Sequence, residues 1–300
     1  MGPRFQYCRS PDPDADGQGH RALCAPLFGT GKLSEPLNKA PLWLRAYRIL
    51  RILLLLMFGA VATLLLFPIC GDTARLRLKR DWSAALVDAF GVSIEADIRY
   101  AKPGCLIVAN HISWLDIFVI NAVLPSAFVA KDDIRAWPLF GWLAAKSDTI
   151  FLRRGSRGHA RQINETVASL LGTGRDVAVF PEGTTTDGRS LLHFHAALIQ
   201  PALAAGRPVL PVALSYWSAD GERSLAPRYD GDVSLGASVS AILDERQLVV
   251  RLCTTPLLGY SGEDRKQVAL AARQAIASAA GLPLVSTEPE IPPGLPVAPR

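Results

Sequence analysis

Two side chains able to form a general base, His111 and Asp116, stand five residues apart. They follow an apolar run at 105–109 that predicts a buried strand. Residues five apart on a regular helix point in different directions, so we expect His111 in the turn before a helix whose N-cap is Ser113. A carboxylate beside the imidazole fixes its tautomer and raises its basicity, which suits removal of a proton from an alcohol. The alternative is a histidine that only packs or caps.

A second cluster follows the apolar run 177–180, in the segment FPEGTT at 180–185. The proline ends the strand and Gly183 permits a tight turn, which predicts that Glu182 is exposed at the carboxyl end of the sheet. The backbone N–H groups of Gly183 and of the threonines Thr184 and Thr185 are then placed to bind an anion or a sugar-like hydroxyl. The alternative is a solvated acid in an ordinary turn.

Two further features lie on predicted strands. The run 149–152 leads into Arg153 and Arg154, and arginine binds phosphate well through its planar guanidinium. The strand 209–213 is interrupted by Pro211, which is typical of an edge strand or of a wall beside a site. An ordinary charged surface is the alternative for the two arginines.

Strands alternate with helices from about Asp81 onwards. The expected strands, apolar and partly β-branched, are 92–98, 105–109, 127–130, 149–152, 177–180, 209–215 and 248–252. The helical patterns between several of them are 114–123, 137–146, 159–171, 192–204 and 263–279. This alternation predicts an α/β fold with a mixed, mainly parallel sheet flanked by helices, and chemistry is expected beyond the carboxyl ends of its strands.

Residues 52–71 form an uncharged run of 20 residues that begins ILLLLMFGAVATLLLF. A helix of this length is about 30 Å long, the thickness of a bilayer's hydrocarbon core, although Pro68 is expected to end or kink it early. The window 41–80 has a charge of +6, within a chain whose net charge is +5. Apolar residues flanked by positive charge are typical of a segment at an anionic lipid surface. We therefore predict a membrane anchor that either spans the bilayer or lies in one leaflet, and a buried core helix is the alternative.

The composition limits the remaining classes of protein. A chain of 300 residues with 49% apolar residues excludes disorder for most of its length. The 5 cysteines are widely spaced and include no CxxC pair, which argues against a disulfide framework or a zinc site. The weak positive charge does not indicate nucleic acid. The expected segments are a disordered 1–40, a membrane anchor with basic flanks at 41–80, a folded domain at 81–282 and a Pro-rich disordered tail at 283–300.

Four motifs occur in a fixed order: NHISWLD at 110–116, IFLRR at 150–154, FPEGTT at 180–185 and VLPVA at 209–213. With them the chain resembles the lysophospholipid acyltransferase family, in particular its bacterial 1-acyl-sn-glycerol-3-phosphate type, over about residues 85–255. The resemblance implies a fold of the glycerolipid acyltransferase kind with an N-terminal hydrophobic helix, located on the cytoplasmic side of the bacterial inner membrane. It implies a lysophospholipid and an acyl-CoA or acyl-carrier-protein thioester as substrates, membrane lipids as partners, no nucleic acid, and no metal or other cofactor.

The resemblance also implies roles for individual residues. His111 takes the proton of the acceptor hydroxyl as that oxygen attacks the thioester carbonyl, and Asp116 orients and stabilises the imidazole. An acylated Ser113 is the competing mechanism. The motif with Pro211 is linked to the donor side, and the motifs with Arg154 and with Glu182 and Gly183 are associated with the acceptor. The residues placed by these motifs in substrate binding are Arg154, Glu182, Gly183, Thr184 and Pro211.

Departures from the family pattern keep the acceptor open. Asp148 replaces a glycine, Arg153 stands where an acid is common, and His195 lies where a basic residue is frequent. The first expected acceptor is 1-acylglycerol-3-phosphate, which gives phosphatidic acid, and another lysolipid such as lyso-ornithine lipid is the alternative. A catalytically inactive lipid-binding homologue is a second alternative. A serine hydrolase is disfavoured because no GxSxG motif occurs, and no metal is expected at His193 and His195 because helical residues two apart do not face each other.

Overall fold

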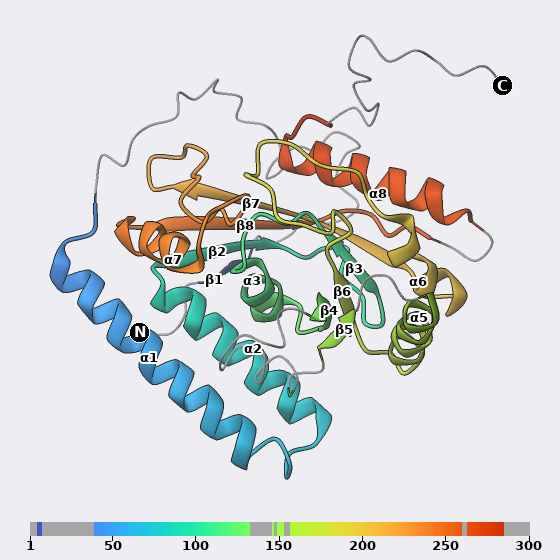
Figure 1. The fold of residues 1–300 in the computed structure, drawn as a ribbon, viewed down its shortest axis with the longest axis horizontal. Coiled ribbons are helices and arrows are strands. Elements are labelled where there is room, and N and C mark those ends of the chain that lie inside the picture. The colour runs from blue at the N-terminus through green and yellow to red at the C-terminus, as the bar shows by residue number, and fades with distance from the viewer. Residues whose placement is uncertain are drawn as a thin grey trace, which may run out of the picture.

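The structure, a computed structural model, describes residues 5–7, 39–132, 146, 149–152, 157–259 and 263–284. Its centre is an eight-stranded sheet in the order β1-β2-β8-β7-β3-β6-β4-β5 (Figure 1). All neighbouring strands are parallel except β7 and β8, so the predicted mixed, mainly parallel α/β fold is confirmed. The strands are β1 (Phe5–Tyr7), β2 (Val92–Asp97), β3 (Leu106–Ala109), β4 (Ala127–Lys131), β5 (Ile150–Leu152), β6 (Val177–Val179), β7 (Val209–Ser218) and β8 (Leu248–Thr254).

Helices cover both faces of this sheet, as a mainly parallel sheet requires. One face packs against α2, α3 and α7, and the other packs against α5, α6 and α8. On β3, Ile107 and Ala109 face the first layer, whereas Leu106 and Val108 face the second. The helices are α1 (Leu42–Leu65), α2 (Asp72–Ala89), α3 (Asp116–Val123), α5 (Arg157–Gly172), the 3-10 helix η2 (Ala196–Leu198), α6 (Gln200–Ala204), α7 (Leu235–Asp244) and α8 (Arg265–Ala280).

Several element predictions need correction. The helix expected at 192–204 is broken: His195 has an extended backbone, η2 follows it, and α6 begins only where Pro201 fits a helix N-terminus. Neither α2 nor α7 was expected, and α2 runs without a break through residue 80. Within the segment 1–40 predicted to be disordered, Phe5–Tyr7 pairs with β2. The helix expected at 137–146 lies outside the described residues apart from Lys146, as do most of 1–40 and all of the tail beyond 284.

Of the two interpretations of Pro211, the edge strand is wrong, because β7 lies between β8 and β3 in the middle of the sheet, and a wall beside the site stays a prediction. The Pro211 carbonyl oxygen accepts the Thr255 N–H at 3.0 Å, so the ring nitrogen of Pro211 also faces the segment around Thr255. That segment has already left β8, which ends at Thr254. The missing N–H of the proline therefore removes no bond between β7 and β8.

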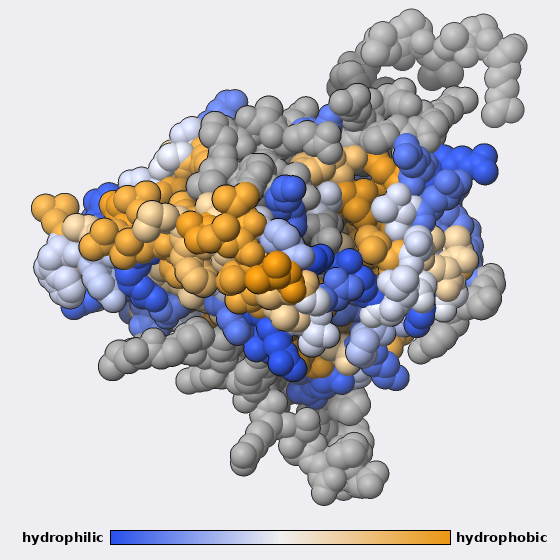
Figure 2. All heavy atoms as spheres, turned by 90° about the horizontal axis from the view of Figure 1, so that it is seen from below, coloured by the Kyte–Doolittle hydropathy of each residue, from blue (hydrophilic) through white to orange (hydrophobic). Residues whose placement is uncertain are grey.

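The apolar helix α1 is longer at its start than the uncharged run and ends at Leu65, three residues before Pro68. One side of it packs on the domain: the Trp82 indole N–H on α2 donates to the Leu55 carbonyl at 2.7 Å. Nearer the N-terminus of α1, the buried Arg48 guanidinium donates to the carbonyls of Glu245 and Arg246 at 2.6 and 2.7 Å. Only 22% of its most apolar window is buried, and Figure 2 shows apolar side chains gathered along it.

Candidate active site

The site begins where β3 ends, in the middle of the sheet. Asn110, the first residue after the strand, uses its side chain as a bridge to β7: its amide donates to the Leu214 carbonyl at 3.1 Å and accepts the Leu214 N–H at 2.8 Å. This pair of hydrogen bonds fixes the direction in which the chain leaves β3. The next residue is His111, so its position is set by a buried polar contact and not by a loose loop.

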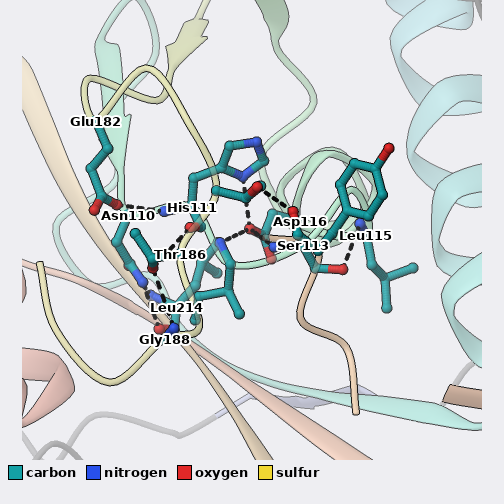
Figure 3. A network of polar contacts seen from close by, with 12 residues as sticks. Asn110, His111, Ser113, Leu115, Asp116, Glu182, Thr186, Gly188 and Leu214 are labelled. Carbon is teal, nitrogen blue, oxygen red and sulfur yellow. Dashed lines mark hydrogen bonds and ion pairs between the residues drawn. The ribbon is translucent and has the colours of Figure 1, made fainter. Parts of the chain in front are cut away.

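His111 and Asp116 are in direct contact, with 2.9 Å between the imidazole Nδ1 and the carboxylate Oδ2 (Figure 3). They meet because His111 lies in the turn before α3 and Asp116 is the first residue of that helix. The same Oδ2 accepts the backbone N–H groups of Ile112 and Ser113 at 2.7 and 2.9 Å. The turn is therefore wrapped around the carboxylate, which is 0% exposed.

This geometry settles which imidazole nitrogen can act as a base. An ionised carboxylate only accepts hydrogen bonds, so Nδ1 carries the proton and Nε2 keeps its lone pair. The ring is also fixed from its face, because it stacks on Phe180 with 3.8 Å between centroids and 8° between planes. The His111 side chain is 17% exposed, which leaves part of the ring accessible to a substrate.

Ser113 does not do what the sequence predicted. The N-cap residue of α3 is Leu115, and the Ser113 hydroxyl accepts the Leu115 N–H at 3.2 Å. Ser113 is 0% exposed. A serine enclosed in this way is poorly placed to attack a thioester, which disfavours the acylated-serine mechanism.

Glu182 was expected to point outward, and this expectation is wrong: its side chain is only 4% exposed. Its Oε1 accepts the His111 N–H at 2.9 Å, and its Oε2 accepts the Leu192 N–H at 2.9 Å. Figure 3 shows His111 between the Glu182 and Asp116 side chains. The carboxylate therefore ties the backbone of His111 to the segment before η2, and both of its oxygens are already engaged by the chain itself.

Burial raises the pKa of the Glu182 carboxyl to about 7, from an ordinary value of 4.5. The nearby negative charge of Asp116 adds to the rise, while hydrogen bonds from Leu192 and His111 and the positive charge of Arg273 oppose it. The proton is thus bound more tightly in the folded chain than in the unfolded chain. The Glu182 carboxyl therefore ionises near neutral pH in the folded protein, beside the backbone N–H of His111 that it accepts.

This shift predicts how stability changes with pH. The folded state holds the Glu182 proton between about pH 4.5 and 7 while the unfolded state has lost it, so the free energy of unfolding falls across that range by up to about 3 kcal/mol. In Glu182→Gln this part of the slope of unfolding free energy against pH should disappear. Denaturant unfolding in detergent at a series of pH values measures it, with the exposed Glu165→Gln on α5 as control. An unchanged slope in Glu182→Gln contradicts the assignment.

The loop after Glu182 closes around His111. Gly183 has φ of +70°, and a side chain there would come within 3.3 Å of the His195 ring, so glycine is required at this position. Its N–H donates to the Phe180 carbonyl at 3.1 Å, and the Thr186 N–H donates to the His111 carbonyl at 2.8 Å. The predicted anion site at the backbone of Gly183 is therefore already occupied by the chain, while Thr184 is exposed.

Sequence reasoning missed Tyr216 altogether. Its hydroxyl donates to the second carboxylate oxygen of Asp116, Oδ1, at 2.6 Å, and its side chain is 2% exposed. Tyr216 lies on β7, which neighbours β3 in the sheet, but 100 positions separate it from Asp116 along the chain. No local spacing links the two residues. The only signal was a tyrosine at the end of a mostly apolar run, where a buried hydroxyl needs a partner.

The sequence of the chain is similar to those of known proteins. A sequence model of the acyltransferase family, described as "Acyltransferase", matches residues 92–215. A lyso-ornithine lipid O-acyltransferase of Pseudomonas aeruginosa is 41% identical over 202 residues, which cover 67% of this chain and 78% of that protein. The chain belongs to the acyltransferase family.

Other relatives agree with this assignment. A 1-acyl-sn-glycerol-3-phosphate acyltransferase of Neisseria meningitidis is 39% identical over 185 residues, covering 62% of this acyltransferase and 71% of its relative. The fold also matches the crystal structure of PlsC, the 1-acyl-sn-glycerophosphate acyltransferase of Thermotoga maritima, with a TM-score of 0.57. That match has 24% identity and covers 78% of this chain and 94% of PlsC. The chain is accordingly an O-acyltransferase with the fold that the sequence predicted.

The remaining predicted residues of the acyltransferase site lie in different places. Arg154 is outside the described residues. Pro211 is buried on β7 and pairs with Val108 on β3, the strand that precedes the pair formed by His111 and Asp116 (the dyad). His193 and His195 are exposed on an extended segment, with 5.9 Å between ring centroids. The described part of the chain holds no group of three or more His, Cys, Asp or Glu side chains suited to a metal, and chemistry without a cofactor stays a prediction.

Proposed function

We propose that this acyltransferase moves a fatty acyl group from a thioester to the free hydroxyl of a lysophospholipid by direct attack. His111 Nε2 takes the proton of the hydroxyl as its oxygen bonds to the thioester carbonyl carbon, and the thiolate then leaves with its electron pair and is protonated. Asp116 stabilises the imidazolium that forms between these steps. The observation that carries the proposal is the 2.9 Å contact between Nδ1 and the buried carboxylate.

The acceptor we propose first is 1-acyl-sn-glycerol-3-phosphate, which gives phosphatidic acid. Two relatives from Neisseria carry this activity in their names, at 39% and 42% identity. The donor is acyl-CoA or an acyl carrier protein thioester, and either one delivers the same carbonyl to the site.

Lyso-ornithine lipid is the second candidate acceptor. The relative from Pseudomonas is named for it, and the positions before η2 hold the exposed His193 and His195 where no lysine or arginine stands. Histidine is only partly charged at neutral pH, which favours an acceptor without a doubly charged phosphate.

A panel of acceptors tests the proposal. Purified full-length enzyme in mixed micelles receives one labelled acyl thioester, as its CoA or carrier-protein form, together with lysophosphatidic acid, lyso-ornithine lipid or lysophosphatidylethanolamine. Labelled phosphatidic acid as the main product supports the first acceptor, and labelled ornithine lipid supports the second. If no lipid is labelled with any pair while the thioester stays intact, the chain is an inactive homologue and the proposal fails.

We also propose that the enzyme works at the cytoplasmic face of the bacterial inner membrane, attached through α1. The exposed face of this helix includes Leu53, Met57 and Val61, while its opposite face is fixed to the domain. The predicted basic flanks are consistent with binding to anionic headgroups. A lysolipid then reaches the site without its acyl chain leaving the bilayer.

The double variant Leu53→Glu/Met57→Glu should release the enzyme from membranes. Both side chains are more than half exposed, so two carboxylates there disturb no core contact but oppose insertion into lipid. We expect a shift of most of the protein from the membrane fraction to the soluble fraction, measured by flotation with anionic vesicles. The exposed Leu270→Glu on α8 is the matched control and should stay bound. Equal binding by all three proteins would contradict attachment through α1.

A further inference from the structure

The carboxylate of Asp116 has an asymmetric set of hydrogen bonds. Its Oδ2 accepts from the His111 ring and from the backbone N–H groups of Ile112 and Ser113, at 2.7 to 2.9 Å. Its Oδ1 accepts from the Tyr216 hydroxyl at 2.6 Å. Tyr216 is therefore hydrogen-bonded to the carboxylate oxygen that the His111 ring does not contact.

The titratable and charged groups around this dyad come from four elements. Asp116 begins α3, Glu182 follows β6 and contacts the His111 backbone, and Tyr216 lies on β7. Arg273 on α8 acts on Glu182. Among the salt bridges of the described residues, Asp116 has His111 as its partner and no lysine or arginine. The buried negative charge is thus balanced by hydrogen-bond donors alone, and one of these donors is a side chain that mutation can remove.

We propose that Tyr216 is a positioning residue that holds the Asp116 carboxylate in register with the imidazole and limits the basicity of His111. Its hydroxyl draws part of the carboxylate charge toward Oδ1, so less charge faces Nδ1. Without it, Oδ1 is buried with no donor, the charge concentrates on Oδ2, and the imidazolium is held more strongly. Burial and the adjacent Asp116 charge raise the pKa of Tyr216 well above its ordinary value, so its hydroxyl remains a donor at every working pH.

The inference rests on the proposed role of His111 as the base, and the variant Tyr216→Phe tests it. Turnover at the pH optimum should fall about tenfold, because the carboxylate loses a charge-assisted hydrogen bond. The acidic limb of the pH–rate profile should move up by about one pH unit, because His111 then holds its proton more tightly. The KM for the lysolipid acceptor should not change, since Tyr216 is buried behind Asp116.

Glu182 also titrates near neutral pH, so the comparison is repeated in a Glu182→Gln background, where the Tyr216→Phe shift must persist. Tyr100→Phe is the matched control, because it removes the hydroxyl of a half-buried tyrosine that packs against the same core. Tyr100→Phe should leave the acidic limb of the pH–rate profile unchanged. The same shift in Tyr100→Phe would overturn the inference.

A direct readout separates this inference from the proposed function. The C2–H resonance of His111, identified by its loss in His111→Ala, is titrated by NMR in detergent micelles in wild type and in Tyr216→Phe. A higher titration midpoint in Tyr216→Phe supports the inference. An unchanged midpoint and limb overturn it even when His111→Ala is inactive, and an active His111→Ala overturns the proposed function together with the inference.

If Tyr216→Phe does not fold, 3-fluorotyrosine placed at position 216 keeps the test decisive. Its hydroxyl is a more acidic and therefore stronger donor, so it draws more charge to Oδ1. The His111 midpoint and the acidic limb should then move to lower pH. A movement to higher pH, or none, overturns the inference.

Discussion

Replacement of His111 with alanine is expected to lower the rate of acyl transfer by about 10³-fold or more, because it removes the base that takes the proton of the attacking hydroxyl. The imidazole is the group whose Nδ1 is held by Asp116 at 2.9 Å and whose face lies on Phe180. Transfer of a labelled acyl group to the preferred lysolipid, under single-turnover conditions, measures the effect on the chemical step.

The His111→Ala protein should remain folded and bound to membranes, because the ring is partly exposed and the turn keeps its backbone contacts to Glu182 and Thr186. Circular dichroism and vesicle flotation check both points. Gln162→Ala is the control, since Gln162 is exposed on α5, has no place in the proposed site and should retain nearly full activity. More than a tenth of wild-type turnover in His111→Ala would show that His111 is not the base.

Replacement of Asp116 with asparagine is expected to lower the rate by roughly 10²- to 10⁴-fold. The amide oxygen can still accept from Ile112 and Ser113, so the turn keeps its shape, but the side chain no longer carries the charge that stabilises the imidazolium. Its amide nitrogen also faces the Tyr216 hydroxyl, which must then turn to accept. The rate at saturating substrates measures this loss.

The control for this variant is Asp72→Asn, at an exposed position in the first turn of α2. It removes the same charge from the chain without touching the dyad and should leave turnover within about twofold of wild type. A higher KM with unchanged turnover in Asp116→Asn would indicate that the carboxylate acts on the substrate and not through His111.

The parts of this site that depend on neighbours along the chain were predictable. His111 and Asp116 meet because a strand end, a turn and a helix start follow one another within a few residues. The direction of Glu182 was not predictable, because it depends on two backbone N–H groups, one of them 71 positions away at His111. The partner of Tyr216 depends on which strands are neighbours in the sheet, and strand order is a property of the whole fold.

Strand order also explains why the edge-strand interpretation of Pro211 was wrong. A proline in a strand usually indicates an edge, but the local pattern could not show that β8 stops at the level where the proline needs no partner. The break in the expected helix at 192–204 had a visible cause in Pro201. The early start of α1 at Leu42 had no such local cause, because its first turns are held by contacts with the domain such as the salt bridge between Arg45 and Asp244.

The contact of Arg48 with the end of α7 limits how a soluble form of the enzyme can be made. Gly91 has φ of +81° and a side chain there would overlap the Arg48 guanidinium, so the domain surface is shaped to receive this arginine. A truncated chain that starts after Leu65 would uncover the Glu245 and Arg246 carbonyls and the Trp82 indole at once. Recoding the lipid-facing side of α1 with polar residues, while keeping Arg48, is therefore the sounder route to a detergent-free preparation.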